Sequence, residues 1–308
     1  MCSGRFLSNS KLLRQVSLYG DRLLGRLVKY LLASLSRTNP DRASDLCGAV
    51  ARRFGPLLPA HRIGRTNLRA AYPDQDTDWI EATLRAAWEN LGRVAGEYVH
   101  LGKLWDYDAE HPNTGRIITD DEQLFMDLQN DNKPALCFAA HLGNWELPAV
   151  MAATHGLPSA VLYRMPNNKA VAREISRIRA PLMGRLIRSR AQAPLEMAAS
   201  LERGEHLGML VDQHFSRGVD VTFFGRRCKA NPSIARLARQ FDCPVVGVRV
   251  IRLPDRRFRI AAEGPFSLPR DTTGRIDVVQ STQMITAVVE RWIREHPDQW
   301  LWFHRRWR

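Results

Sequence analysis

Beyond Lys133, the chain alternates short apolar runs with longer segments of helical periodicity. The apolar runs have the length of buried strands and lie at residues 134–140, 159–163, 207–211 and 244–250. Helical patterns lie between them, at residues 169–190 (interrupted at Pro181), 195–203 and 231–241. Because strands that alternate with helices form largely parallel sheets, this pattern predicts an α/β fold with a central, mostly parallel sheet flanked by helices. For the last helix, the sequence predicts Asn231 as N-cap and Pro232 at the first helical position.

The preceding residues are predicted to be helical. Residues 78–101 repeat apolar side chains at helical spacing, after a capping-box-like start formed by Asp78 and Glu81. No repeat or Pro/Gly/Ser-rich linker divides the chain. We therefore expect a helical N-terminal extension over residues 1–105 and one continuous α/β domain over residues 106–308.

Residues 11–36 have the pattern of a basic amphipathic helix. An apolar stripe is formed by Val16, Leu23, Leu24, Leu27, Leu31 and Leu35, and cations recur at Arg22, Arg26 and Lys29. Such a helix can lie in a membrane interface, or it can be a surface helix packed on the protein's own core. No stretch offers the roughly 20 apolar residues of a spanning helix, and no secretory signal is recognisable.

The chain is strongly basic, with 45 lysines and arginines against 32 acidic residues and a formal net charge of +13. This balance predicts a polyanionic partner: nucleic acid, an anionic membrane surface, a phosphorylated substrate or an acidic carrier protein. The five cysteines are scattered and form no CxxC pair. That usage disfavours a disulfide framework or a structural zinc site and suits a reducing cytoplasm.

Polar residues follow the predicted strands, where ligands bind in open α/β sheets. The first run leads into His141-Leu-Gly-Asn-Trp-Glu146, the second into Tyr163-Arg164, and the third into Asp212-Gln213-His214. The ends of parallel strands meet at one edge of a sheet, so we expect these polar groups to gather there.

His141 and Glu146 are predicted to act as a base and its orienting carboxylate. Within one helix they would point about 140° apart, so they can pair only if His141 precedes a helix that begins near Gly143 or Asn144. Glu146 would then fix the imidazole tautomer and leave the other nitrogen free as a general base. No G-x-S-x-G nucleophile elbow occurs, which favours direct transfer to a substrate hydroxyl over an acyl-enzyme.

These motifs resemble those of a known family. His141 to Glu146 is similar to the H-x4-D/E motif of glycerolipid acyltransferases, and nearly the whole chain resembles the bacterial lipid A late acyltransferases of the lauroyl/myristoyl type. The resemblance is carried by Ala139–Glu146, Tyr163-Arg164 with Asn167 and Asn168, Val211–Gln213, Phe223–Gly225 and Trp302–Arg306. The mycobacterial phosphatidylinositol mannoside acyltransferases are relatives and share the Gly-Asn-Trp form of the motif, so another glycolipid stays open as acceptor.

The resemblance implies an enzyme at the cytoplasmic face of the inner membrane. It would move an acyl chain from acyl-acyl-carrier protein to a hydroxyl of a phosphorylated lipid A precursor, with no metal or other cofactor. His141 would be the general base, Glu146 its partner, and Arg164 a ligand of the substrate phosphate or the developing oxyanion. The motif residues Asp212, Asn144 and Gln213 are expected to bind substrate.

Two other classes of function remain open at this point. The C-terminal segment, residues 300–308, mixes aromatic and basic side chains that could contact nucleic acid, a bilayer interface or the protein's own core. A nucleic-acid-binding protein would be basic too, but no helix-turn-helix, zinc-finger or RNP signature is visible. A membrane-surface protein without catalytic activity would also be basic. The presence of all four residues expected at the active site argues against this class: His141, Glu146, Arg164 and Asp212.

Overall fold

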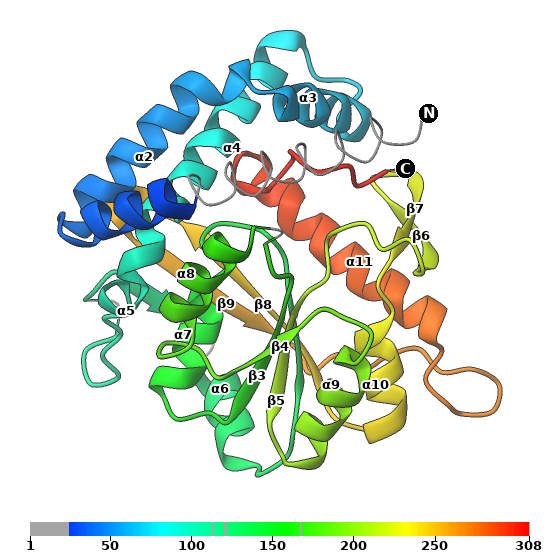
Figure 1. Ribbon diagram of the computed structural model, residues 1–308. Coiled ribbons are helices and arrows are strands. Elements are labelled where there is room, and N and C mark those ends of the chain that lie inside the picture. Colours follow the sequence, from blue (N-terminus) through cyan, green and yellow to red (C-terminus); the bar gives the residue numbers. More distant parts are fainter. Residues whose placement is uncertain (1–24, 113, 120–121, 167, 308) are drawn as a thin grey trace, which may run out of the picture.

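A seven-stranded sheet forms the centre of the molecule (Figure 1). The computed structural model describes residues 25–112, 114–119, 122–166 and 168–307. The strand order is β1-β9-β8-β2-β5-β3-β4, and every neighbouring pair is parallel except β8 and β9. The strands are β1 (Ile117–Thr119), β2 (Leu136–Ala139), β3 (Ser159–Tyr163), β4 (Arg185–Arg188), β5 (His206–Leu210), β8 (Val245–Arg252) and β9 (Phe258–Glu263). The predicted α/β class with a mostly parallel sheet is confirmed.

The four predicted strands correspond to β2, β3, β5 and β8, each within about two residues at either end. The helix predicted over residues 169–190 is wrong in its second half. Helix α8 covers only Lys169–Arg179. Residues Arg185–Arg188 form β4, which pairs in parallel with β3 and is the last strand at that edge of the sheet. Pro181 cannot continue the helix, and an added Cβ at Gly184 would collide with Ser159, so the chain passes close to β3 there.

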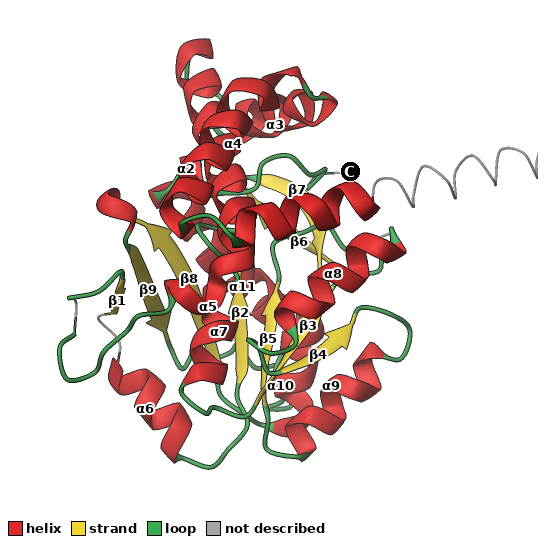
Figure 2. Cartoon of the chain, turned by 60° about the vertical axis from the view of Figure 1, so that its left-hand side comes forward, coloured by secondary structure: helices red, strands yellow, loops and turns green. Residues whose placement is uncertain are grey.

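Helices cover both faces of the sheet (Figures 1 and 2). The helices that lie between and after the strands in the sequence are α6 (Glu122–Asn130), α7 (Leu147–Thr154), α8, α9 (Ala193–Glu202), α10 (Ser233–Phe241) and α11 (Val278–Glu295). On one face, Phe138 of β2 stacks on Trp292 of α11 at 5.5 Å between ring centroids. On the other, Leu147 and Val150 of α7 pack with Val248 of β8. The antiparallel hairpin β6 (Val219–Phe223) and β7 (Arg226–Ala230) lies outside the main sheet.

Two predicted helix starts differ from the observed ones. Helix α4 covers Thr77–Glu97, and its N-cap is Asp76, whose carboxylate accepts from Trp79 N; the predicted start at Asp78 with Glu81 is therefore wrong. Helix α10 begins at Ser233, after Pro232, so the predicted N-cap at Asn231 lies one residue too early. The side chain of Asn231 still accepts a hydrogen bond from Ser233 N at 3.0 Å.

Helices before the sheet gather at one end of the molecule (Figure 2). They are α2 (Pro40–Phe54), α3 (Pro59–Ala71) and α4, whereas the short α5 (Leu101–Leu104) that follows them lies beside α7. Helix α4 reaches the carboxyl edge of the sheet, because Asn90 Nδ2 donates to the carbonyl of Gly143 at 3.0 Å. The 3₁₀ turns are η1 (Gly55–Leu57), η2 (Tyr98–His100), η3 (Pro254–Arg256) and η4 (Pro297–Gln299).

The amphipathic helix predicted over residues 11–36 falls partly outside the described residues, which include its last part, a helix over residues 25–36. There Leu35 is buried, whereas Leu27 and Leu31 are 64% and 56% exposed. In the part of the chain that the structure describes, no helix combines the length and hydrophobicity that crossing a bilayer requires.

Candidate active site

His141 lies just beyond β2, and its imidazole is held by Asp212. Nδ1 of His141 is 2.8 Å from Oδ1 of Asp212, and the backbone N–H of His141 donates to Oδ2 at 2.9 Å. Asp212 follows β5, which pairs in parallel with β2, so two adjacent strand ends bring these residues together. A carboxylate on Nδ1 assigns the proton to that nitrogen and leaves the lone pair of Nε2 for a substrate.

Asp212 is a buried anion with three hydrogen-bond donors. In addition to the two from His141, Nε1 of Trp300 donates to its Oδ2 at 2.7 Å. Burial alone would raise the pKa of Asp212, but attraction to His141 and the hydrogen bonds outweigh it, so the pKa lies far below its ordinary value. Asp212 therefore remains ionised wherever His141 can act as a base.

The predicted contact between Glu146 and the imidazole is wrong. The structure places the Glu146 carboxylate against Arg179, whose Nη2 and Nε donate to its two oxygens at 2.5 and 3.0 Å. The helix begins only at Leu147, so Glu146 is its N-cap, and residues 141–146 form a turn that directs the carboxylate toward α8. Among the described residues, the carboxylate that contacts His141 is Asp212.

Arg179 is a site residue that the sequence did not reveal. Its side chain is largely buried between the rings of Tyr98 and Tyr163, each 5.6 Å from the guanidinium. Burial would lower the pKa of Arg179, but Glu146 raises it more, and the net shift is upward. One arginine near the end of an amphipathic helix carries no local signal among 45 basic residues.

The turn between His141 and Glu146 is fixed from behind by α4. Gly143 adopts φ +57°, and a Cβ there would collide with the carbonyl of Val250. Nδ2 of Asn144 donates to Glu97 at 2.8 Å, and Glu97 also accepts from Arg252 at 2.6 and 2.9 Å. Asn144, expected to bind substrate, is thus fully buried and faces Glu97.

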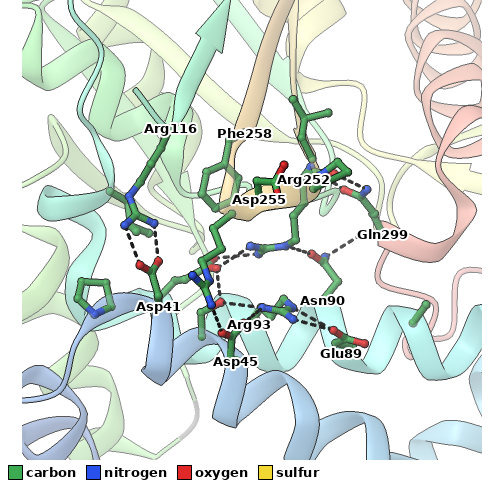
Figure 3. A pocket seen from close by; sticks show the side chains of 18 of the residues that line it. Asp41, Asp45, Glu89, Asn90, Arg93, Arg116, Arg252, Asp255, Phe258 and Gln299 are labelled. Carbon is green, nitrogen blue, oxygen red and sulfur yellow. Dashed lines mark hydrogen bonds and ion pairs between the residues drawn. The ribbon is translucent and has the colours of Figure 1, made fainter. Parts of the chain in front are cut away.

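Arg252 belongs to a charged pocket of about 430 Å³ between α2, α4 and the β8–β9 edge. Figure 3 shows Arg252 beside Asn90, to which its Nε donates at 3.0 Å, with Gln299 close by. Further ion pairs join Arg116 to Asp41 and Arg93 to Asp45. These ion pairs connect α2, α4 and the segments that border β1 and β8, and Glu97 links this network to residues 141–146, the catalytic turn.

In front of the turn lies a cavity of about 910 Å³, within the range of ligand sites. Its apolar walls include Phe125, Leu128, Met151, Val161, Met183, Leu186, Val248 and Ile260. His206 at the amino end of β5 and Gln213 beyond its carboxyl end both line it, so it extends along the five-residue strand, about 16 Å at ~3.3 Å per residue. His141, Glu146 and Arg179 line the same cavity.

The remaining predicted residues lie around this cavity. Arg164 follows β3, is exposed, and lines the cavity. The amide nitrogen of Gln213 is 3.4 Å from Nε2 of His141, at the long limit of a hydrogen bond. The structure therefore brings His141, Glu146, Arg164, Asp212 and Gln213 to one edge of the sheet and turns Asn144 away from the cavity.

The C-terminal segment closes this edge. Leu142 forms a β-bridge with Trp300, and Leu301 N donates to the carbonyl of His141 at 3.1 Å. His304 and Arg305 line the cavity beside His141. Residues more than 150 positions away thus complete the surroundings of the imidazole, which no local pattern predicts.

The arrangement provides an oriented base, two arginines and an elongated apolar cavity. Among the residues that the structure describes, no group of three or more histidine, cysteine, aspartate or glutamate side chains could hold a metal ion.

Comparison with curated proteins gave no match. A family model described as bacterial lipid A biosynthesis acyltransferase matches residues 10–308. With the match covering almost the whole chain, and the fold and site described above, the chain belongs to the bacterial lipid A biosynthesis acyltransferase family.

Proposed function

We propose that the protein transfers a fatty acyl chain from acyl-acyl-carrier protein to a hydroxyl group of a phosphorylated lipid A precursor. The observation that carries the proposal is the His141–Asp212 pair at one end of the apolar cavity. An oriented base beside a chain-shaped apolar space suits a reaction between a polar hydroxyl and a fatty acyl thioester.

His141 acts as the general base. Its Nε2 takes the proton of the acceptor hydroxyl as the oxygen attacks the thioester carbonyl carbon. The C–S bond then breaks, and the departing thiolate takes the proton back from His141. Asp212 stays ionised and stabilises the imidazolium that forms between these steps.

Arg164 and Arg179 supply positive charge at the cavity. Arg164 is exposed and contacts the phosphate of the acceptor or the oxyanion of the tetrahedral intermediate. Glu146 acts through Arg179, because the ion pair fixes the guanidinium between two tyrosine rings. Gln213 lies within reach of the Nε2 side of His141 and contacts the hydroxyl that His141 deprotonates.

The apolar cavity holds the acyl chain. Burial of each methylene group contributes about 0.8 kcal/mol, so a long chain gains several kcal/mol from a cavity lined by aliphatic and aromatic side chains. The chain length accepted depends on where the cavity ends, near Ser159 and His206.

The enzyme works at the cytoplasmic face of the inner membrane, where a soluble carrier protein meets a membrane lipid. Exposed apolar side chains on the N-terminal helices support this proposal: Leu27, Tyr30, Leu31, Leu46, Val50, Phe54, Leu57 and Leu58. The net charge of +13 favours anionic lipids and an acidic carrier. Flotation with anionic vesicles tests it, with L27D/L31D as the variant expected to bind more weakly and L195D, which changes an exposed leucine on α9, as the control.

The central experiment is acyl transfer by purified protein from a panel of acyl-acyl-carrier proteins to a lipid A precursor. We expect product with at least one donor, and none with His141→Ala. A matched control is His111→Ala, because His111 is an exposed histidine away from the cavity. Folded wild-type protein without product from any donor would contradict the proposed reaction; normal turnover by His141→Ala would contradict the role of the base.

A further inference from the structure

Gly208 lies at the centre of β5 and lines the apolar cavity. Its neighbours in the strand, Leu207 and Met209, are buried in the core, and successive side chains of a strand point to opposite faces. Gly208 is in register with Cys137 of β2 and Val161 of β3, and both of these residues line the cavity. Because side chains in register on parallel strands point to the same face, a side chain at position 208 would project into the cavity.

The space where that side chain would lie is open. A Cβ added to Gly208 would have its nearest neighbours, the carbonyl oxygen of Ala160 and Cγ2 of Val161, at 3.9 Å, which is ordinary van der Waals contact. Gly208 lies in a regular strand and has no positive φ, so neither the backbone nor a collision requires a glycine there. A glycine inside a strand weakens it, and it often marks a place where a ligand approaches the backbone closely.

The level of Gly208 in the cavity corresponds to a particular carbon of a bound acyl chain. From His141 back to Cys137, which is level with Gly208, the chain spans about 13 Å at ~3.3 Å per residue. An extended alkyl chain advances ~1.25 Å per carbon, from the length and angle of its C–C bonds. A thioester carbonyl held at His141 therefore places about the tenth carbon of the chain over Gly208. The cavity continues to Ser159 and His206, about 7 Å further, which allows about 16 carbons in all.

We infer that the acyl chain lies against the backbone of Gly208 and that this glycine admits chains longer than about 10 carbons. The inference rests on the proposed acyl transfer and names a residue that sets its chain-length limit. A larger side chain at position 208 would fill the cavity between Cys137 and Val161 and would cut off the inner end at His206. Gly208 lies about 13 Å from the level of His141, so it determines specificity and takes no part in the chemistry.

Gly208→Val tests the inference with the panel of acyl-acyl-carrier proteins. Valine favours a strand and its Cβ fits the open space, so the variant should be at least as stable as wild type. We expect its turnover of chains shorter than about 10 carbons to stay near that of wild type. For longer chains, kcat/KM relative to wild type should fall about fourfold for each methylene group that can no longer be buried. Thr222→Val changes an exposed residue of β6 outside the cavity and should keep the wild-type profile.

Binding of free saturated fatty acids provides a readout that does not depend on turnover. With the wild-type protein, calorimetry should show that the affinity rises with chain length up to about 16 carbons. With Gly208→Val, the rise should stop at about 10 carbons. Because neither carrier protein nor acceptor takes part, this series tests the chain site separately from the proposed reaction.

Identical chain-length profiles of folded Gly208→Val and wild type would overturn the inference, as would an equal loss at every chain length. A wild-type affinity that does not depend on chain length would overturn it too. If the valine variant does not fold, Gly208→Ala takes its place: it adds one carbon and should weaken the binding of chains longer than about 10 carbons and not of shorter ones. Wild-type protein that binds fatty acids as expected but transfers no acyl group would instead count against the proposed function.

Discussion

Asp212 and His141 are joined twice, through the imidazole Nδ1 at 2.8 Å and through the backbone N–H at 2.9 Å. The double contact fixes both the ring and the start of the turn that carries it. Glu146, five residues further along, instead forms a bidentate ion pair with Arg179. The motif therefore contains the base, while the carboxylate on its Nδ1 comes from the end of β5.

Replacing Asp212 by Asn should lower kcat by roughly 10³–10⁴, because the amide cannot balance the imidazolium and can select the wrong tautomer. The measurement is the pH profile of kcat for folded protein. Asp220→Asn, at an aspartate whose side chain is 77% exposed, should behave as wild type. Near-normal turnover by Asp212→Asn would show that another group orients His141.

Replacing Glu146 by Gln should destabilise the protein by about 3–5 kcal/mol, because it leaves the cation of Arg179 buried without its partner. Urea denaturation measures the effect. Glu196→Gln removes a more exposed ion pair with Arg190 and should change stability by less than about 1 kcal/mol. Equal losses in the free energy of unfolding for the two variants would mean that the buried ion pair stabilises the protein no more than the exposed one.

Gly143→Ala should cost both stability and turnover. Gly143 has φ +57°, and its Cβ would meet the Val250 carbonyl, so the catalytic turn must shift. Gly274→Ala is the matched change: φ is +78° and the space around it is open, so only the backbone strain of about 1–2 kcal/mol applies. Turnover should fall for Gly143→Ala alone, and equal turnover in the two variants would contradict a positional role for the glycine.

Asn144→Ala should lower stability by about 1–3 kcal/mol, since Glu97 loses one of its buried donors. The KM values of both substrates should change little, because the Asn144 amide faces Glu97 and not the cavity. Asn130→Ala, at an exposed position, serves as the control. A large rise in KM without loss of stability would show that Asn144 binds substrate, as the sequence predicts.

Stability should fall as the pH decreases from about 7 to 5. Burial lowers the pKa values of His100, His155, His206, His296 and His304 below their ordinary value of 6.5. The unfolded chain then binds protons in a range where the folded protein does not, so protonation favours unfolding. Urea midpoints across this range provide the measurement.

One substitution tests a single member of this group. His100 is buried, and its Nε2 bonds to the carbonyl of Leu35 at 2.9 Å. His100→Gln can keep that donor but does not titrate, so it should flatten the dependence of stability on pH. An unchanged slope would show that His100 does not contribute.

The sequence determined the fold class because its strongest signals are local. Apolar runs of strand length between helical patterns led to β2, β3, β5 and β8, and polar residues beyond three of these strands marked the correct edge of the sheet. It did not reveal β4, whose arginines give Arg185–Arg188 little apolar character, because an edge strand needs few buried side chains.

Tertiary structure alone decided which charged groups meet. The short distance in the sequence led to the prediction that Glu146 contacts His141. Because α7 begins only at Leu147, the Glu146 carboxylate instead points to Arg179 on α8. Asp212, Glu97 and Leu301 contact the catalytic turn from the end of β5, from α4 and from the C-terminal segment. Periodicity reports the burial of each segment along the chain, whereas the pairing of buried charges depends on where separate elements pack, and that is fixed only in the folded molecule.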